Sequence, residues 1–402
     1  MRIAVVYDCL FPHTIGGAER WHRNVAEHLA ERHEVVYLTR RQWGAEGPDA
    51  PFPVLAVSGP DNLYTSSGRR GIGPTLRFGW GVFRHLLRHS DRYDVVHTAS
   101  FPYFSVIGAA AALRLRRSRA PLIVDWHELW SRDYWRTYLG PLAGRLGMAV
   151  QTLCVRLADL SFTFSGLVEE RLREHGFRGD IVRLSGEYAG PEHSERTDPE
   201  VPHMPPTTLF AGRHIPEKRV TAIPAAIAAA RRELPDLRCL ILGDGPETAD
   251  VRAAVAELGL GDAVEVRGRV SDEEVAQALA SATCLLNPSL REGYGLVIVE
   301  ACVRGTPAIV VAGSDNAAVE LVEPGRNGFV AVTADPDELA RAIVACVKGG
   351  ERLRRRTLEW YAANRERLSL RNSLETIEAA YADLADRAAA SPGSDAESGV
   401  PA

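Results

Sequence analysis

Short apolar runs rich in β-branched residues alternate along this chain with segments whose apolar residues recur at helical spacing. The run Arg2–Tyr7 is followed by the amphipathic segment Ala18–Glu31 and by a second apolar run, Val35–Leu38. The alternation begins again at Thr207–Ala211. Runs of this kind form strands buried on both faces of parallel sheets, which crossover helices connect. The pattern therefore predicts an α/β protein with two parallel sheets.

The length and the break in this alternation predict how the chain is divided. A chain of 402 residues exceeds one ordinary hydrophobic core, and residues 186–206 are rich in Pro, Glu, His and Ser without periodicity. We expect a first domain at 1–185, a linker at 186–206, a second domain at 207–350, closing helices at 351–387 and a disordered tail at 388–402.

Local patterns give further expectations about single segments. Residues 40–74, rich in Gly, Pro, Ser and Arg, are expected to form a long irregular connection. Residues 140–158 and 219–233 each read as one helix. Ser271 and Glu274 have the spacing of a capping box at the start of a helix.

Composition excludes several classes of protein. The formal net charge of −5 and the pI of about 6.2 give no reason to expect nucleic acid as a partner. The six cysteines are scattered without metal or redox spacing, which favours reduced thiols in the core. The first residues lack the pattern of a signal peptide, and the longest weakly polar run, Phe101–Leu113, is too short to span a bilayer. We expect a cytoplasmic protein.

The segment around Glu292 contains the strongest functional signal. The apolar run Ala282–Leu286 leads into a loop ending Glu292-Gly293-Tyr294-Gly295, and the apolar helix Leu296–Arg304 follows. A glycine turn that feeds the start of a helix suits an anion such as phosphate, because the first amides of a helix are unpaired and carry partial positive charge. Glu300 adds a second carboxylate inside the helix, so the pair could hold hydroxyl groups on two parts of one ligand.

Three other loops follow predicted strands. Gly16 and Gly17 follow the first strand, and His127, beside Glu128, follows a strand that ends near Asp125. In the second half, Arg213 and Lys218 lie between a strand and a helix, which predicts an anion site by charge and by helix dipole. Only two of the 47 basic residues are lysines, Lys218 and Lys348, so a lysine at this position is informative. No cluster of Asp, Glu or His with metal-ligand spacing accompanies this site, so we expect neither a metal nor an organic cofactor.

Together these motifs resemble the retaining GT-B glycosyltransferases of family four. Two glutamates separated by seven residues, as Glu292 and Glu300 are, form that family's donor motif. The resemblance implies that Glu292 contacts the donor sugar, that Glu300 holds the ribose, and that Arg213 and Lys218 bind the diphosphate. It also implies a role for His127 beside the sugar. In the family an Asp more commonly follows this His, which leaves the role of Glu128 open.

The resemblance thus implies two sets of site residues. The catalytic set is His127, Arg213, Lys218 and Glu292. The donor-binding set is Gly16, Gly17, Arg269, Val270, Gly293, Tyr294, Gly295, Leu296 and Glu300. It further implies two Rossmann-like domains facing each other across a cleft, the first binding the acceptor and the second the nucleotide sugar, with the closing helices crossing back onto the first.

The implied reaction transfers a sugar, with retention, from a UDP-, GDP- or dTDP-linked donor to an acceptor hydroxyl without a metal. The acceptor is unidentified; a lipid-linked glycan and a small metabolite both fit. A nucleotide-sugar epimerase and a non-catalytic sugar-nucleotide-binding partner subunit are the alternatives of the same fold. A glycoside hydrolase would not need the cations Arg213 and Lys218, and a nicotinamide dehydrogenase would need a complete glycine fingerprint that residues 8–17 lack.

A run of arginines at the end of the predicted helix Phe101–Arg117 bears on the location of the protein. Arg114, Arg116, Arg117 and Arg119 form it. Such a run usually marks a solvated face, and the alternative is peripheral contact with an acidic membrane surface or with the acceptor. The arginine-rich, lysine-poor usage suggests a bacterial source.

Overall fold

The computed structural model describes residues 1–63, 70–190 and 205–390. Its first sheet has seven parallel strands in the order β3-β2-β1-β4-β5-β6-β7. Their bounds are β1 Arg2–Val6, β2 Glu34–Arg40, β3 Val54–Ser58, β4 Val95–Ala99, β5 Leu122–Trp126, β6 Leu160–Thr163 and β7 Asp180–Arg183. The central strands β1, β4, β5 and β6 are almost entirely buried, as expected where helices cover both faces of a sheet.

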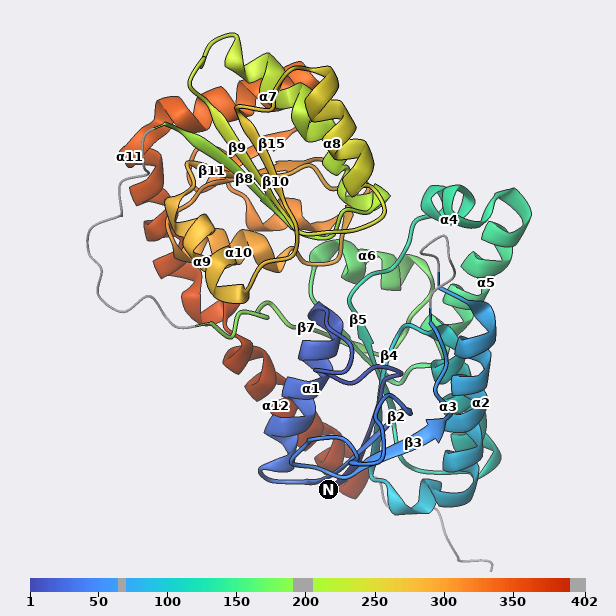
Figure 1. The fold of residues 1–402 in the computed structure, drawn as a ribbon. Helices are drawn as coiled ribbons and strands as arrows, with labels where there is room; N and C mark the ends of the chain where they lie inside the picture. The colour runs from blue at the N-terminus through green and yellow to red at the C-terminus, as the bar shows by residue number, and fades with distance from the viewer. Residues whose placement is uncertain (64–69, 191–204, 391–402) are drawn as a thin grey trace, which may run out of the picture.

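The second sheet has six parallel strands in the order β10-β9-β8-β11-β13-β15. These strands are β8 Thr207–Ala211, β9 Arg238–Leu242, β10 Val264–Arg267, β11 Cys284–Asn287, β13 Ala308–Val311 and β15 Gly328–Ala331. A short parallel pair, β12 (Arg291–Glu292) and β14 (Asp315–Asn316), stands apart from it. The prediction of an α/β protein with two parallel sheets is therefore confirmed (Figure 1).

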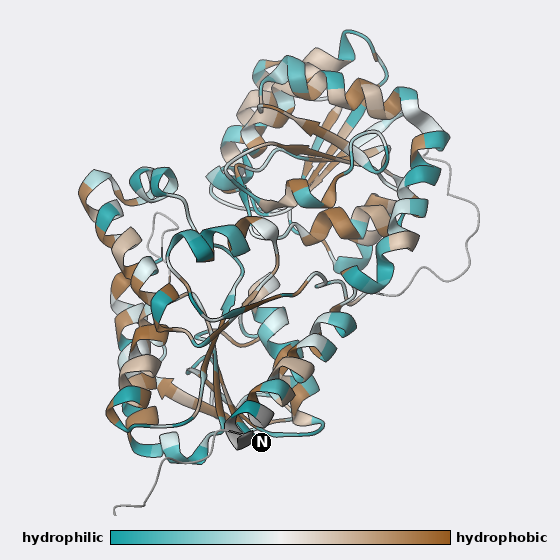
Figure 2. Ribbon diagram, turned by 180° about the vertical axis from the view of Figure 1, so that it is seen from behind, coloured by the Kyte–Doolittle hydropathy of each residue, from teal (hydrophilic) through white to brown (hydrophobic). Residues whose placement is uncertain are grey.

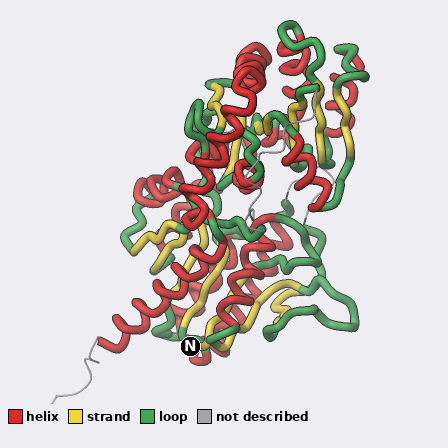
Figure 3. The backbone as a smooth tube through the Cα atoms, turned by 90° about the vertical axis from the view of Figure 1, so that its left-hand side faces the viewer, coloured by secondary structure: helices red, strands yellow, loops and turns green. Residues whose placement is uncertain are grey.

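Helices pack on both faces of each sheet (Figure 3). Those of the first domain are α1 Gly17–Ala30, α2 Ile72–His89, α3 Tyr103–Leu115, α4 Arg132–Leu139, α5 Pro141–Leu157 and α6 Gly166–Glu174. Those that follow are α7 Ile223–Arg231, α8 Thr248–Glu257, α9 Asp272–Ser281, α10 Leu296–Val303, α11 Pro336–Leu368 and α12 Leu370–Ala390. Short 3-10 turns span Ser90–Arg92, Pro216–Lys218, Val220–Ala222 and Ala317–Leu321.

Two expectations about local structure were wrong, and one helix was not predicted. The connection at 40–74 contains β3, which pairs in parallel with β2, because the alternation Val54–Ser58 suits an edge strand. The helix expected at 140–158 is confirmed as α5, but the separate helix α4 before it, which Ser131 caps and Gly140 ends at φ 83°, was not predicted. The helix expected at 219–233 begins only at Ile223, because Arg219 adopts a left-handed conformation. The capping box of Ser271 and Glu274 is present and starts α9.

The last two helices connect the domains. α11 bends at Gly350, whose φ of 49° is not helical, and α12 leaves the second sheet and packs against α1 of the first domain (Figure 1). There the Tyr381 hydroxyl lies 2.6 Å from His97 Nδ1, and Arg32 donates to Glu378 at 2.9 Å. Most of the linker expected at 186–206 and the end of the tail expected at 388–402 lie outside the described residues.

The interiors of both domains are apolar and contain no disulfide. Apolar residues dominate the strands of both sheets (Figure 2), and all six cysteines are buried and free, which confirms the expectation of reduced thiols. Among the described residues, no helix has the length and apolar character required to cross a membrane.

Arg354 joins α11 to the ends of two other helices. Its side chain is buried and donates to the carbonyl groups of Ala280, Ala282 and Arg304, the last at 2.9 Å. The carbonyl groups at the end of a helix lack partners within the helix, so one guanidinium here satisfies α9 and α10 together.

Replacing Arg354 should therefore destabilise the second domain. Arg354→Met keeps the length of the side chain but leaves several buried carbonyl groups unpaired, and we expect a loss of about 3 kcal/mol in the free energy of unfolding. Urea unfolding followed by circular dichroism measures it. Arg355→Met, at an exposed neighbouring position, is the control. Equal stability of both variants would contradict the role given to Arg354.

Candidate functional site

The loops that follow the strands of the two sheets meet between the domains. Gly293, just before α10, lies against the backbone of His127, just after β5. A Cβ atom added to Gly293 would lie 2.2 Å from the His127 carbonyl oxygen and 2.8 Å from Cγ of Glu128. Any side chain at position 293 would therefore push the two domains apart.

Glu292 is held by three donors. Its Oε1 atom accepts from Lys218 Nζ at 2.5 Å, from Ser289 Oγ at 2.8 Å and from Asn287 Nδ2 at 3.1 Å. Burial alone would raise the pKa of Glu292, but the Lys218 charge and these hydrogen bonds outweigh it and lower the pKa. A carboxylate and an ammonium thus lie side by side between the domains, in a position fixed by β11 and its loop.

Arg213 and Lys218 both follow β8 but differ in their surroundings. Lys218 ends the 3-10 turn Pro216–Lys218, and the helix predicted to follow it at residue 219 begins only at Ile223. Arg213 is exposed, and its side chain makes no hydrogen bond or ion pair with the described residues. One cation is therefore committed to Glu292, whereas the other is available to an anionic ligand.

The start of α10 offers amides without a side-chain cap. Gly295 precedes it at φ 99°, a left-handed conformation that favours glycine. Leu296 is its first residue, and Glu300 follows half-buried in its second turn. Burial raises the pKa of Glu300, and the charge of Arg304 opposes this shift.

Tyr294 connects this loop to the first domain. Its side chain is buried, and its hydroxyl donates to the Ser185 carbonyl oxygen at 2.8 Å. The side chain is thus occupied by an interdomain bond, which leaves the backbone of Tyr294 as the part that can face a ligand.

The glycine pair after β1 begins α1. Gly16 precedes the helix with extended backbone, and a Cβ atom there would lie 2.2 Å from Oε2 of Glu19. A Cβ atom on Gly17 would meet nothing within 4 Å. Within the described part of the chain, no side chain caps the amides at the start of α1.

The start of α1 faces the loop before α9. Arg20 of α1 donates to Asp272 of α9 at 2.9 Å. The loop that precedes Asp272 contains Arg269, which is exposed, and Val270, which packs against the core. The ion pair between Arg20 and Asp272 brings the start of α1 in the first domain close to the start of α9 in the second.

His127 lies in an aromatic and largely apolar environment. Its ring stacks on Phe164, with centroids 4.4 Å apart, and lies 5.7 Å from the ring of His22. Burial, and next the nearby His22, lower the pKa of His127 to about 3. The imidazole is therefore neutral at physiological pH and can both donate and accept one hydrogen bond.

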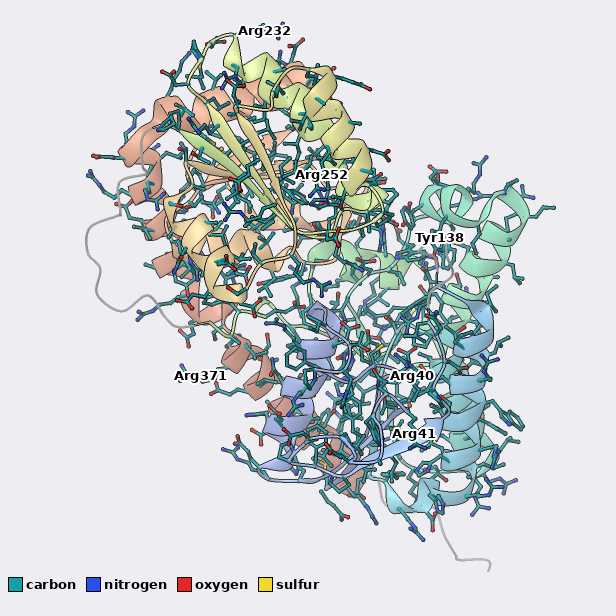
Figure 4. The ribbon with its side chains drawn as sticks, viewed as in Figure 1. Arg40, Arg41, Tyr138, Arg232, Arg252 and Arg371 are labelled. Atoms are coloured by element: carbon teal, nitrogen blue, oxygen red, sulfur yellow. The ribbon has the colours of Figure 1, made fainter. Side chains whose placement is uncertain are left out.

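Glu128 is engaged by Arg291 of the second domain and by Trp130 Nε1, which donates at 3.0 Å. The Arg291 guanidinium lies over the rings of Trp130 and Tyr134, 4.9 and 4.7 Å from their centroids. Tyr134 in turn donates to Glu217 at 2.7 Å. Tyr138, in the next turn of α4 (Figure 4), packs edge to face on Trp130 at 5.1 Å. This aromatic cluster places an arginine of one domain inside the other.

Two acidic residues of the second domain complete the interface. Asp315 accepts from the Ser131 hydroxyl at 2.6 Å and from Arg171 at 2.8 Å. Glu320 accepts from the first two amides of α6, both at 2.8 Å, where a carboxylate complements the helix dipole.

A buried polar network lies behind His127. Asp125 accepts from Trp21 Nε1 at 2.7 Å and contacts His97 Nε2 at 2.6 Å, while His22 Nε2 lies 3.5 Å away. Burial would raise the pKa of Asp125, but His97 outweighs it and the pKa falls to about 2. Tyr381 of α12 closes the network on the other nitrogen of His97. Because Asp125 belongs to β5, this network holds in place the end of the strand from which the loop with His127 begins.

Sequence reasoning missed five residues of this region: Glu187, Asn287, Ser289, Arg291 and Asp315. Three of them, Asn287, Ser289 and Arg291, lie shortly before Glu292 in the sequence. Closeness to this glutamate was therefore a signal that could have identified them. Nothing in the sequence marked Glu187 or Asp315, which the fold brings in from distant segments. No group of three or more His, Cys, Asp or Glu side chains arranged to hold a metal ion occurs in the described part of the chain.

Two family models match adjoining parts of the chain. Residues 16–187 match "Glycosyl transferase 4-like domain", and residues 192–362 match "Glycosyl transferases group 1".

Curated relatives match over a shorter stretch. A D-inositol 3-phosphate glycosyltransferase of Streptomyces scabiei is 35% identical over 144 residues, which are 34% of this chain and 32% of that protein. A 2-deoxystreptamine glucosyltransferase of Streptomyces kanamyceticus is 33% identical over 138 residues, covering 34% of this chain and 35% of that protein. The chain thus matches about a third of the length of these relatives.

Solved structures match over nearly the whole chain. Sucrose-phosphate synthase of Thermosynechococcus elongatus aligns with a TM-score of 0.73 and 19% identity, covering 96% of this chain and 99% of that one. HepE of Anabaena in complex with UDP aligns with a TM-score of 0.72 and 19% identity, covering 95% and 100%. The fold and the two family models agree: the chain belongs to the group 1, family four glycosyltransferases of the GT-B fold.

Proposed function

We propose that this protein transfers a sugar, with retention of anomeric configuration, from a nucleotide diphospho-sugar to an acceptor hydroxyl, without a metal ion. The observation that supports this best is the grouping of Lys218, Glu292 and the uncapped start of α10 beside His127. Carboxylate, ammonium and helix amides are the groups that a sugar diphosphate needs around it. Solved relatives of the same fold contain UDP and UDP-glucose.

The charges of the site fit the charge that develops in this reaction. As the bond between sugar and phosphate breaks, negative charge grows on the leaving diphosphate. Arg213, Lys218 and the start of α10 supply positive charge that is already in place, and in this proposal they take the part that a divalent ion plays in other transferases. Glu292 and His127 orient the sugar, and Glu300 accepts from the ribose hydroxyls. Gly16, Gly17, Arg269 and Val270 border the phosphates and the base.

The other functions of the same fold are less well supported. A non-catalytic partner subunit would not need to preserve the Lys218–Glu292 pair together with His127. A nucleotide-sugar epimerase would act on the same donor without an acceptor, so product analysis in the absence of an acceptor distinguishes it. The two curated relatives described above have the names of glycosyltransferases.

A donor screen tests the proposed function. We expect the melting temperature to rise by several degrees with UDP-, GDP- or dTDP-glucose, depending on the base, since ligand binding to the native state stabilises it. The rise should persist in EDTA and shrink in Arg213→Ala and Lys218→Ala. Turnover with the stabilising donor should fall by about 10²–10³ in either variant. Loss of all activity in EDTA, restored by Mg²⁺ or Mn²⁺, would refute metal independence.

The two motif glutamates should differ in their effects. Glu300→Gln should weaken binding of the free nucleoside diphosphate by about tenfold, because it removes a charged acceptor of ribose hydroxyls. Glu292→Gln should reduce sugar transfer but leave that affinity within about threefold, since it loses the sugar contact and frees Lys218 for the phosphates. Calorimetry and a transfer assay measure both effects.

Glu359→Gln, an exposed position on α11, is the control for both variants. If Glu292→Gln lost as much nucleotide affinity as Glu300→Gln, the separate roles proposed here would be wrong.

We further propose that the protein works in the cytoplasm and contacts the membrane through its first domain. Free, buried cysteines suit a reducing compartment. Ile72, Leu76 and Trp80 follow one another at four-residue spacing on α2 and are 65%, 47% and 60% exposed. Leu142 and Leu146 on α5 are 76% and 67% exposed. Figure 2 shows apolar residues on the outer side of these helices.

The charge of this face favours an anionic membrane. α2, α3 and α5 contain no Asp or Glu, and α3 packs between the other two. Their exposed basic residues are Arg77, Arg84, Arg88, Arg114, Arg145 and Arg156. Apolar side chains surrounded by arginine fit the boundary of a bilayer that contains anionic lipid. A protein bound to the membrane in this way could reach an acceptor that is attached to a lipid.

Vesicle sedimentation tests this contact. The protein should bind vesicles that contain roughly 30–50% phosphatidylglycerol but not vesicles of pure phosphatidylcholine. The reason is that each arginine near an anionic surface contributes about 1 kcal/mol to the binding free energy. Leu76→Ser with Trp80→Ser should weaken binding about tenfold or more. Leu258→Ser, at a 45% exposed leucine of the second domain, should not. Absence of binding to anionic vesicles would refute the proposal.

A further inference from the structure

Two buried polar atoms between the domains face each other without forming a hydrogen bond. Nε2 of His127 lies 3.7 Å from Oε1 of Glu187, and neither atom has a hydrogen-bond partner among the residues that the structure describes. The Glu187 side chain is 10% exposed and that of His127 is 23% exposed. A buried polar atom without a partner costs about 1–3 kcal/mol, so two of them at one place call for a ligand.

Glu187 is held rigidly in this position. Its neighbours on both sides bond to the junction of α11 and α12: the Gly186 amide donates to Ser373 Oγ at 3.1 Å, and the Tyr188 amide donates to the Leu368 carbonyl at 3.2 Å. A Cβ atom on Gly186 would lie 2.2 Å from the Ser369 carbonyl oxygen. The carboxyl group is therefore directed toward His127 by a backbone that cannot shift without moving both helices.

The groups around Glu187 determine its protonation. His127 faces it from the end of β5, Asp125 from β5 itself, and Tyr294 from the loop before α10. Burial, and next the Asp125 charge, raise the pKa of Glu187 to about 8. Both members of the pair are thus neutral at pH 7: the carboxyl group carries a proton, and the imidazole of His127 is uncharged.

A neutral acid and a neutral imidazole are matched by a neutral hydroxyl group. A hydroxyl donates one hydrogen bond and accepts two, so placed between the two side chains it can donate to one and accept from the other. An ammonium group could not accept a hydrogen bond, and neither of these neutral side chains supplies the positive charge that a phosphate group requires. Because Gly293, next to Glu292 of the sugar site, lies against the His127 backbone, such a hydroxyl would belong to the sugar and not to the nucleotide.

We propose that Glu187 and His127 together bind one hydroxyl group of the transferred sugar, and that Glu187 thereby helps to determine which sugar is accepted. This inference rests on the proposed transfer reaction. The inference adds to the proposed sugar site one residue, Glu187, from the segment that joins the two domains.

The test uses the nucleotide sugar found in the donor screen. Glu187→Leu keeps the approximate size of the side chain but can neither donate nor accept a hydrogen bond. We therefore expect KM for the nucleotide sugar to rise about 10- to 100-fold. Glu187→Gln, whose amide can still donate, should stay within about threefold at pH 7. Affinity for the free nucleoside diphosphate should not change in either variant. Glu170→Leu, at an exposed position on α6, is the matched control.

Two further readouts separate ligand binding from a structural role. With monodeoxy analogues of the donor, one analogue should react equally well with wild type and Glu187→Leu, because it lacks the hydroxyl concerned. The wild-type kcat/KM for the donor should fall as pH rises through about 8, where the Glu187 carboxyl loses its proton. Glu187→Gln should lack this decline, because an amide does not titrate there.

The outcomes are distinguishable. If Glu187→Leu leaves KM unchanged, or if Glu187→Gln shows the same alkaline decline as wild type, the role of Glu187 is refuted while the transfer reaction stands. If Glu187→Leu weakens the free nucleotide as much as the nucleotide sugar, its effect is structural and the inference also fails. If the wild type turns over no nucleotide sugar, both proposals fall.

Discussion

The contact between Gly293 and the backbone of His127 sets the distance between the two domains, and the rest of the site depends on it. Two sheets that fold separately have no intrinsic reason to present their loops to each other at a fixed spacing. A position without a side chain lets one loop touch the backbone of the other. Glu292 and Tyr294, its neighbours, are consequently held at the boundary between the domains.

Charge and aromatic surface keep the domains in this arrangement. Arg291 enters the aromatic cluster of the first domain, Asp315 bonds to Ser131 and Arg171, and Glu320 caps α6. Each contact joins a group of one domain to a complementary group of the other. Polar interfaces of this kind permit rigid-body movement, because water can replace the bonds when they separate.

The fold could be predicted from the sequence to a large degree, because strand and helix periodicities are local. The apolar run Arg2–Tyr7 and the capping box at Ser271 specify their own elements, whatever the rest of the chain does. β3 escaped prediction because an edge strand depends on its partner β2. In the site, the motif indicated Glu292 and Glu300, but the Lys218–Glu292 pair joins residues 74 positions apart and has no local signature. Glu187 is significant only because the chain crosses between the domains beside His127.

The bond from Tyr381 to His97 has a consequence for how the protein is made. His97 and Asp125 are buried in the first domain, yet the group that completes their network is on α12, about 200 residues after the last strand of that domain. During synthesis on the ribosome, the first sheet emerges hundreds of residues before this partner. The nascent first domain must therefore hold a polar core that is incomplete until α12 is synthesised, and its final packing is tied to the synthesis of that helix.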